Sequence, residues 1–244
     1  MLDKRLLLPI VLVATIAYSA VSAGLVFKSG ERSEKDLARD AKSKGPEIVE
    51  MVGLKEGMVV ADLLGGGGYY SEIISEKVGK SGSVMLHNNK AYMPYVEKEL
   101  EARLANNRLS NVVRHDRETH ALQFGESTLD AMFFVLGYHD IYHQAEGWKI
   151  DREGLLVQIR DAIKKGGKLV IVDHSAKEGT KTTHSQELHR IDEQYVIDEL
   201  SSFGFKLLKS STILSNPNDD RTKTPFVPNM RRNTDRFVLI FEKL

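Results

Sequence analysis

Short apolar runs alternate with segments of helical periodicity along most of this chain, and this alternation limits its fold more than any other feature. The run 58–64 is continuous and apolar, and apolar residues then recur at helical spacing until Gly79 ends the helix. The alternation continues with expected strands at 84–87, 112–115, 129–136 and 169–172, and expected helices at 92–105 and 155–163. Because strands that are apolar on both faces need helices to cover them, the pattern predicts a parallel, doubly wound α/β sheet.

The last part of the chain departs from this pattern. A helix is expected at 194–203, after which 205–214 and 236–241 are both strand-like and only a polar, proline-containing stretch lies between them. Two consecutive strands without a crossover helix either pair antiparallel or belong to different sheets. We therefore expect the parallel strands to be followed by an antiparallel strand hairpin.

The first 27 residues differ in composition from the rest of the chain. Lys4 and Arg5 precede an apolar run at 6–18, and small residues ending at Ala23 fit cleavage by a signal peptidase. The apolar stretch continues to Phe27, and about 22 apolar residues also suffice for one uncleaved membrane-spanning helix. A signal peptide or membrane anchor at 1–27 predicts an exported protein, periplasmic or anchored to the inner membrane; a buried helix of a cytosolic protein is the remaining alternative.

Composition limits the domain count and the partners. With 244 residues and 41% apolar content, the chain suits one α/β domain, which we expect at 46–244, preceded by a charged linker or the start of a surface helix at 28–45. Lys plus Arg equals Asp plus Glu at 34 each, so no basic surplus predicts a nucleic-acid partner. The absence of cysteine excludes disulfides, thiolate metal sites and cysteine nucleophiles.

A glycine-rich turn joins the first strand to the helix that follows it. In VVADLLGGGGYYSEII, Asp62 ends the strand, and the turn consists of Gly65, Gly66, Gly67 and Gly68. Backbone without side chains lets a ligand approach closely, and exposed amides at a helix start favour an anionic group. The dinucleotide pattern G-x-G-x-x-G fails at Ser71, which argues against a nicotinamide oxidoreductase. A simple tight turn is the alternative.

These features resemble class I S-adenosylmethionine-dependent methyltransferases. That family has an acid followed by glycines at alternate positions; Asp62, Gly66 and Gly68 match, whereas Leu64 replaces the first glycine. The stretches IKKGGKLVIVDHS and LHRIDEQYVIDELSSFGFKLL extend the resemblance over about 46–244, most closely to a bacterial group of predicted methyltransferases with export signals. The resemblance implies a Rossmann-like seven-stranded sheet, S-adenosylmethionine as cofactor, and a small-molecule acceptor that the sequence does not identify.

Two further positions correspond to cofactor contacts. Asn88, followed by Asn89, ends the second strand, where an acid normally binds the ribose hydroxyls, and an amide still donates to and accepts from a hydroxyl. Asp116, after the third strand, matches the position at which the family contacts the adenine amino group. The alternatives are an asparagine pair that turns the chain, and a helix cap or surface acid.

The fourth strand ends in Tyr138, His139 and Asp140, at the carboxyl edge where ligands of open α/β sheets bind. Methyl transfer needs alignment of donor and acceptor, and removal of a proton if the acceptor requires it. His139 is the predicted base, with Asp140 orienting it or replacing it. A hydrogen-bonded loop pair without catalytic function is the alternative.

Other residues are expected around an acceptor pocket at the same edge. Tyr138, His174 and Arg190 are predicted acceptor contacts, together with Arg231 in a basic loop, 215–234, which covers the pocket if the sixth strand is parallel to the others. The charges of that loop suit an acidic or phosphorylated acceptor. His139, His143, Asp173 and His174 hold metal-ligand atoms, but their spacing is unspecific, so no metal site is predicted.

Two functional hypotheses remain. The first is an active methyltransferase, which the acid, the remaining glycines and Asp116 favour. The second is a non-catalytic, exported binding module of the same fold, which Leu64, Asn88 and the export segment favour, because S-adenosylmethionine is made in the cytosol. Of these two hypotheses, we expect the active methyltransferase. Contact with a membrane is expected only through an uncleaved N-terminal segment, and the oligomeric state is not predicted.

Overall fold

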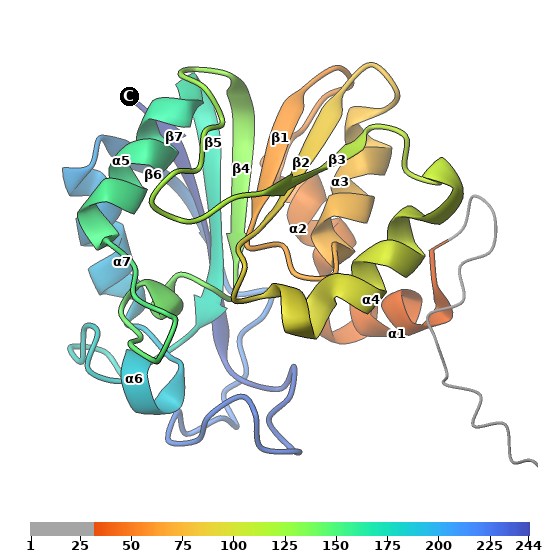
Figure 1. Cartoon of the computed structure of the whole chain (residues 1–244). Coiled ribbons are helices and arrows are strands. Elements are labelled where there is room, and N and C mark those ends of the chain that lie inside the picture. The colour runs from red at the N-terminus through yellow and green to blue at the C-terminus, as the bar shows by residue number, and fades with distance from the viewer. Residues whose placement is uncertain (1–31) are drawn as a thin grey trace, which may run out of the picture.

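One seven-stranded sheet, ordered β3-β2-β1-β4-β5-β7-β6, organises the computed structural model, which describes residues 32–244 (Figure 1). Only β7 runs antiparallel to its neighbours β5 and β6, and the other adjacent pairs are parallel. The expected parallel sheet with an antiparallel strand pair at its end is therefore confirmed. The strands are β1 Val59–Leu63, β2 Ser83–Asn88, β3 Val112–Asp116, β4 Leu129–Val135, β5 Ile163–His174, β6 Phe205–Ser211 and β7 Arg236–Lys243.

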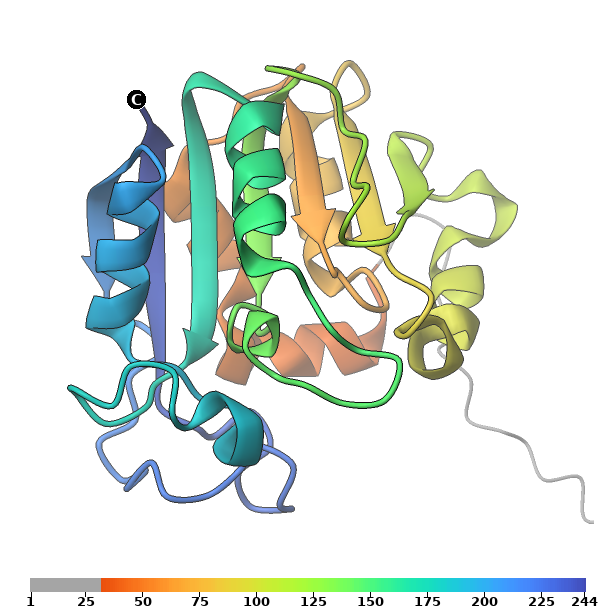
Figure 2. The same cartoon turned by 60° about the vertical axis from the view of Figure 1, so that its left-hand side comes forward.

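Helices cover both faces of the sheet (Figures 1 and 2). On one face α2 and α3 pack over a buried cluster that includes Ile48, Ile74 and Val170, and on the other α5 and α7 pack over a cluster that includes Leu156 and Phe241. Successive strand residues point to opposite faces, so continuous apolar strands supply both clusters. The helices are α1 Glu34–Ser43, α2 Gly45–Val52, α3 Tyr69–Val78, α4 Met93–Leu104, α5 Arg152–Ala162, α6 Ser185–Leu188 and α7 Glu193–Ser202, with short 3-10 turns η1 Ala105–Asn107 and η2 His139–Ile141.

The fifth strand is longer than the sequence indicates. The glycine pair at 166–167 was expected to separate a helix from a strand that begins at Leu169, but β5 starts at Ile163 and includes both glycines. Its register with β4 shifts between Leu129 and Ala131, so the glycines lie where the pairing is irregular. A glycine inside a strand is typical of such a bulge, which a sequence pattern does not distinguish from a helix end.

Of the two expectations for 28–45, a charged linker or the start of a surface helix, the structure shows the helix, because residues 34–43 form α1. Ser33 caps this helix by accepting a hydrogen bond from the amide of Asp36, and the Asp36 carboxylate is buried in an ion pair with Arg103 of α4. A charged stretch with little apolar periodicity is usually solvated, but here a buried counterion compensates its charge. The folded domain therefore begins before Pro46. Residues 1–27, the expected signal peptide or anchor, lie outside the described residues.

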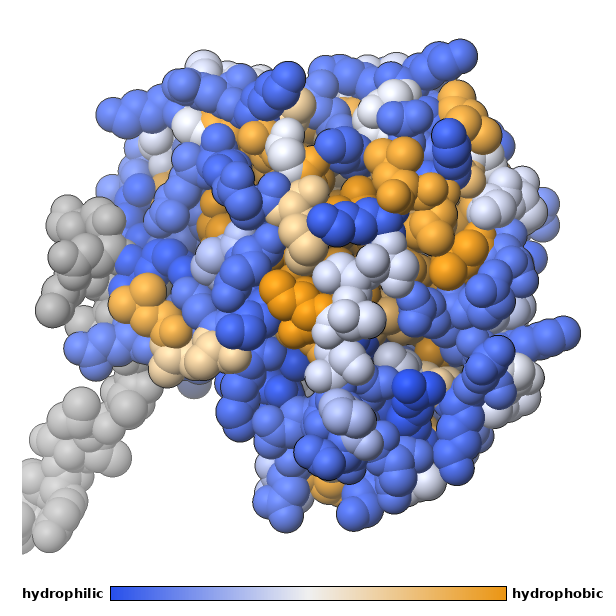
Figure 3. Space-filling view, turned by 180° about the vertical axis from the view of Figure 1, so that it is seen from behind, coloured by the Kyte–Doolittle hydropathy of each residue, from blue (hydrophilic) through white to orange (hydrophobic). Residues whose placement is uncertain are grey.

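The surface of the described domain carries both hydrophilic and hydrophobic side chains. Figure 3 shows one face on which hydrophobic side chains emerge in separate groups between hydrophilic ones. Within residues 32–244, none of the helices combines the length and the apolar character needed to cross a bilayer.

The segment between β6 and β7 lies at the carboxyl edge of the sheet. Because β7 is antiparallel to both β5 and β6, strand β6 runs parallel to β5, and the segment that follows it leaves at the edge where β1, β4 and β5 end. It lies beside α6 below the sheet in both views (Figures 1 and 2). The expectation that this loop covers the edge is confirmed.

Candidate active site

A pocket of about 580 Å³ opens at the carboxyl edge of the sheet. Its wall combines the glycine turn at Gly67, the β4 end at Leu136, helix α1 at Arg39, and the β6–β7 loop at Phe226. The volume lies within the range of small-molecule sites, roughly 300–1,000 Å³. Residues far apart in the sequence therefore form one cavity at the position where open α/β sheets bind ligands.

The glycine turn is packed so tightly that side chains would not fit. A Cβ at Gly68 would lie 2.7 Å from the Leu86 side chain, at a φ of +81° that favours glycine. A Cβ at Gly67 would lie 2.8 Å from Glu99 Oε1, on helix α4. The turn therefore needs its glycines for close packing against α4, as well as for any ligand in the pocket.

Leu64 adopts a left-handed backbone at the position where the family has its first glycine. Its φ is +51°, in the region that a branched, bulky residue rarely adopts. The side chain is 4% exposed and packs in the cluster under α5 and α7, so burial of apolar surface offsets the strain. The backbone at this position therefore has the left-handed conformation that glycine favours, although the residue is leucine.

Asp62 is a buried carboxylate beside the turn with one oxygen unsatisfied. Its Oδ2 accepts a hydrogen bond from Ser71 Oγ at 2.7 Å, and its Oδ1 is buried without a hydrogen-bond partner in the described chain. Burial raises the pKa of Asp62 to about 6, against the lowering effect of Ser71. A buried acceptor without a donor is costly unless a ligand supplies one. The ammonium group of S-adenosylmethionine is a donor of matching charge, so this residue fits the implied cofactor.

The expected ribose contact of Asn88 is not observed. Asn88 Nδ2 donates to the Gly66 carbonyl and its Oδ1 accepts from the Gly66 amide, each at 3.0 Å, and the residue is fully buried. Both polar ends of the amide are therefore occupied by the backbone of the glycine turn. The physical reason is that an amide side chain can both donate to and accept from the same peptide group, whereas a carboxylate can only accept.

Asp116 also lies apart from the pocket. Its exposed carboxylate pairs with Arg114 at 2.8 Å. It lines a separate depression of about 450 Å³, shared with Lys90 and His120. The structure therefore gives Asp116 the surface position that was the alternative, and the expected adenine contact is not brought to this pocket.

A buried charge cluster behind the turn was missed in the sequence. Arg103 of α4 is fully buried and pairs with Asp36 of α1 at 2.8 Å, with Glu72 of α3, and with Glu99 at 3.1 Å. Its Nε also donates to the carbonyl of Gly67. The Arg103 guanidinium therefore connects α1, α3 and α4 to the backbone of the glycine turn. Nothing in the local pattern distinguishes Arg103 from an exposed arginine near the end of a surface helix.

His139 is held between two carboxylates. Its Nδ1 lies 2.7 Å from Asp173 Oδ1 and its Nε2 lies 3.1 Å from Asp140 Oδ1. Burial by itself lowers the pKa of His139, but the charges of Asp173 and Asp140 outweigh burial and raise it to about 10. Because both ring nitrogens lie against carboxylates, neither is open to an acceptor in this arrangement, and the role of His139 as general base stays a prediction.

Asp140 is the ionised group that faces the pocket. Burial raises the pKa of Asp140, but the charge and hydrogen bond of His139 outweigh burial and hold it well below its usual range. Tyr92 donates its hydroxyl to Asp140 Oδ2 at 3.4 Å, and Trp148 stacks on the Tyr92 ring at 5.6 Å. A carboxylate with so low a pKa is a weak proton acceptor, so this arrangement favours the alternative in which Asp140 orients His139.

Two of the four predicted acceptor contacts are structural. Tyr138 is fully buried and donates its hydroxyl to Glu199 at 2.5 Å. Arg190 is fully buried, pairs with Asp219 at 2.8 Å and donates to the Ser175 carbonyl. Both predictions are wrong because these side chains turn from the edge toward the interior. Asp192, two residues later, caps α7 by accepting a hydrogen bond from the amide of Gln194.

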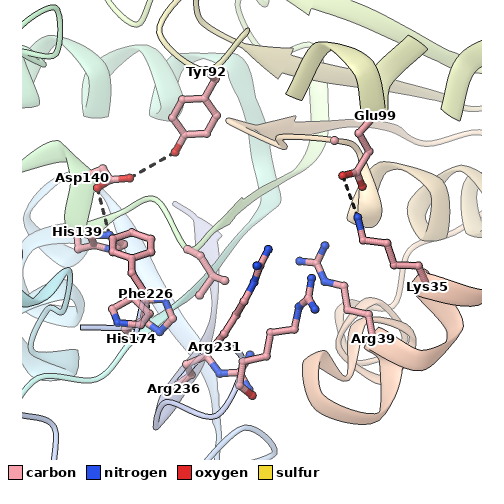
Figure 4. A pocket seen from close by; sticks show the side chains of 14 residues that line it. Lys35, Arg39, Tyr92, Glu99, His139, Asp140, His174, Phe226, Arg231 and Arg236 are labelled. Atoms are coloured by element: carbon pink, nitrogen blue, oxygen red, sulfur yellow. Dashed lines mark hydrogen bonds and ion pairs between the residues drawn. The ribbon is translucent and has the colours of Figure 1, made fainter. Parts of the chain in front are cut away.

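The other two predicted contacts, His174 and Arg231, do line the pocket. His174 Nδ1 lies 2.7 Å from Thr234 Oγ1, and burial holds the pKa of His174 well below its usual value, so the ring is neutral. Figure 4 shows His174 beside His139 and Asp140, with Arg231 pointing into the space opposite them.

Cations dominate the wall opposite Asp140. Arg39, Arg231, Arg232 and Arg236 line it together with Lys35, which pairs with Glu99 (Figure 4). Burial lowers the pKa of the Arg232 guanidinium, and the neighbouring charges of Arg39 and Arg231 lower it further. Like charges held together in this way favour an anionic ligand. Arg39 lies in the segment expected to be a charged linker or the start of a surface helix, and neither expectation places it at the pocket.

Comparison with known proteins identifies the family. The model of the ubiE/COQ5 methyltransferase family matches residues 39–204. Ubiquinone/menaquinone biosynthesis C-methyltransferases of Hydrogenovibrio crunogenus and Legionella pneumophila strain Corby are each 27% identical to the chain, over 147 and 128 residues. The matches cover 57% and 52% of this chain and 54% and 47% of those proteins. The chain thus spans about half the length of the curated relatives that it matches.

Solved structures share the fold at low sequence identity. A methyltransferase dependent on S-adenosylmethionine from Aquifex aeolicus has a TM-score of 0.63 at 18% identity, covering 85% of this chain and 93% of its own. One from Methanosarcina mazei has a TM-score of 0.57 at 15% identity, covering 81% and 97%. A phosphoethanolamine N-methyltransferase 2 from Haemonchus contortus, in complex with S-adenosyl-L-methionine, has 0.56 at 15%, covering 82% and 52%. With the family model matching more than half of its length, the chain belongs to the ubiE/COQ5 methyltransferase family, whose methyl donor is S-adenosylmethionine.

Proposed function

We propose that this chain transfers a methyl group from S-adenosylmethionine to a small acceptor that carries an anionic group. The observation that supports this most is Asp62 Oδ1, a buried oxygen beside the glycine turn that has no donor within the described residues. The curated relatives are named as C-methyltransferases, which agrees with a methyl transfer reaction. The whole activity of those longer proteins is not carried over.

The chain's contribution to such a reaction is alignment and electrostatics. S-adenosylmethionine supplies an electrophilic methyl group on a sulfonium sulfur. Gly67 of the glycine turn lines one side of the pocket, with the buried Asp62 carboxylate behind the turn, and Asp140 lines the other side. In-line displacement needs the reacting atoms held at a near-attack distance, which binding on two fixed walls provides. Phe226, from the β6–β7 loop, lines the pocket and supplies an apolar side chain at its edge.

The acceptor class follows from the charges of the pocket. Arg231 and Arg232 come from the covering loop, and Arg39 and Arg236 lie beside them. Guanidinium groups bind carboxylates and phosphates in a bidentate manner. The acceptor therefore combines a nucleophilic atom near Asp140 with a carboxylate or phosphate on the arginine side.

Replacing Arg231 and Arg232 together by glutamine is expected to lower kcat/KM for anionic acceptors about 10–100-fold, because one or two charge-assisted hydrogen bonds are lost. The measurement is transfer of a labelled methyl group to pools of small carboxylates, phosphates and neutral molecules, with calorimetry of S-adenosylmethionine binding in parallel. Lys206→Gln with Lys209→Gln removes the same charge from the exposed side of β6 and serves as the matched control.

Two results would count against this proposal. Turnover restricted to neutral acceptors, or equal losses in the two double variants, contradicts the anionic acceptor. S-adenosylmethionine binding without transfer to any pool would instead favour a non-catalytic binding module of the same fold.

We also propose that residues 1–27 direct the domain out of the cytoplasm, either as a cleaved signal or as an anchor. The basic pair followed by an apolar run supports this. Alkaline phosphatase fused after residue 40 is expected to be active, because this reporter folds only outside the cytoplasm. An active cytoplasmic reporter, such as β-galactosidase, fused at the same residue would show that the segment does not export.

A further inference from the structure

Three side chains with metal-ligand atoms converge at the edge of the pocket. Asp140 Oδ1 lies 3.1 Å from His139 Nε2 and 3.5 Å from His189 Nδ1. All three ligand atoms lie within 4.8 Å of one another. Zinc bonds of 2.0–2.1 Å in a tetrahedron place neighbouring ligand atoms about 3.3–3.4 Å apart. The two separations from Asp140 are close to this spacing, and the two histidine nitrogens lie within 4.8 Å of each other. An ion bound here takes the place of the protons that the histidines share with Asp140.

The orientation of His139 is imposed by the residue behind it. Asp173 is fully buried, and its Oδ1 lies 2.7 Å from His139 Nδ1 while its Oδ2 accepts the His139 amide at 2.8 Å. A carboxylate on the far nitrogen sets the tautomer and presents the other nitrogen, which is the usual arrangement behind a metal-bound histidine. His139 Nε2 is thereby directed at Asp140.

His189 reaches the cluster through an unusual backbone. It adopts a left-handed φ of +51° directly after helix α6, a conformation uncommon for residues other than glycine. Its ring contacts the rings of His139 at 5.3 Å and Phe226 at 4.7 Å. Backbone strain of this kind persists where the surroundings hold it, and it concentrates at functional positions.

A third imidazole lies beside these three residues. The His143 ring is 4.8 Å from that of His189, and its Nδ1 is buried without a hydrogen-bond partner in the described part of the chain. An unpaired buried nitrogen is unfavourable unless a ligand or ion satisfies it. The cluster therefore contains a nitrogen atom, His143 Nδ1, that could bind an ion and that no hydrogen bond within the described residues occupies.

We propose that His139, Asp140 and His189 bind a divalent transition-metal ion such as Zn²⁺. Two imidazoles and one carboxylate suit zinc and its first-row neighbours, whereas Mg²⁺ and Ca²⁺ require mainly oxygen ligands. Asp140 and Asp173 supply two negative charges next to the ion, which offset its charge in a half-buried site. His139 and Asp140 line the pocket, so the remaining coordination position faces it. The spacing of residues in the sequence did not predict this site, because α5, β5 and α6 lie between Asp140 and His189.

The test uses the full, untagged chain after treatment with a chelator and dialysis. Calorimetric titration with ZnCl₂ is expected to show a single ion per chain, and Co²⁺ is expected to give the visible absorption of tetrahedral coordination. His189→Asn is expected to lower the Zn²⁺ affinity at least 100-fold, since it removes a ligand while asparagine tolerates the left-handed backbone. Asp173→Asn keeps the shape of the side chain but removes its charge and weakens its hold on His139, so it is expected to lower the affinity about 10–100-fold.

His120→Asn is the matched control, because His120 is exposed and lies outside the cluster. Zn²⁺ should raise the thermal unfolding midpoint of the wild type and of His120→Asn, but not that of His189→Asn. Equal midpoints for the three proteins without metal show that each is folded. Absence of Zn²⁺ binding by the wild type, or equal affinity in His189→Asn, would overturn the proposal without bearing on methyl transfer.

Discussion

Replacing Arg103 by methionine is expected to lower the free energy of unfolding by about 3–5 kcal/mol, the effect typical of removing one partner from a buried ion pair. The substitution leaves the carboxylates of Asp36 and Glu72, each 1% exposed, without the guanidinium that pairs with both. Urea unfolding monitored by circular dichroism measures the change. Limited proteolysis should also show earlier cleavage in α1, which Arg103 holds through Asp36.

The control for this variant is Lys98→Met, on the exposed side of the same helix. It should shift the free energy of unfolding by less than about 0.5 kcal/mol, as surface substitutions usually do. Arg103→Lys keeps the charge but not the several fixed donors of a guanidinium, so an intermediate loss is expected. A loss for Arg103→Met no larger than that of Lys98→Met would show that the cluster does not hold the three helices together.

Replacing Asp62 by asparagine is expected to raise the free energy of unfolding at neutral and alkaline pH and to lower the affinity for S-adenosylmethionine. Burial raises the pKa of Asp62 from 3.8 in an unfolded chain to about 6 in the folded protein. The folded protein holds the proton of Asp62 more tightly than the unfolded chain does. This tighter binding stabilises the folded state fully below about pH 4, and the stabilisation is lost as the pH rises through about 6. A shift of this size corresponds to about 3 kcal/mol at most, using 1.36 kcal/mol per pKa unit.

Asparagine carries no charge, so Asp62→Asn should be more stable than the wild type at pH 8 by up to about 3 kcal/mol and should show no such loss between pH 4 and 6. Affinity for S-adenosylmethionine should instead fall about 10–100-fold, because a hydrogen bond to a charged group is lost. Urea unfolding across pH and calorimetry give the two readouts. Asp116→Asn is the control, expected to change neither, since Asp116 is exposed and outside the pocket. Unchanged binding in Asp62→Asn would remove the main support for the cofactor site.

The paired hydrogen bonds of Asn88 illustrate why site residues are harder to predict than strands. The sequence placed Asn88 correctly at the end of β2, beside the glycine turn. Its position in the chain does not say whether the amide points toward a ligand or toward a neighbouring backbone. That choice depends on the register of β1 against β2, where Asp62 lies opposite Leu86, and so on contacts between segments.

Tyr138, Arg190 and Arg103 show the same limit. Tyr138 follows β4 at the ligand edge, as expected, but its hydroxyl finds Glu199 of α7 inside the protein. Arg190 similarly forms an ion pair with Asp219, and Arg103 of α4 forms one with Asp36 of α1. Each partner is distant in sequence, and a buried charge is tolerated only where such a partner exists. No local pattern contains this information.

Periodicity of apolar residues determined the layout of this protein: the strands, the crossover helices, the antiparallel end and the glycine turn at the ligand edge. These features follow from local chain geometry, because residues two apart in a strand or three to four apart in a helix share a face. Only the tertiary structure decided which polar side chains at that edge face the pocket, that α1 belongs to the domain, and that His189 meets His139 and Asp140. Those outcomes depend on pairings between distant segments, whose energies arise from burial and charge compensation after the chain has packed.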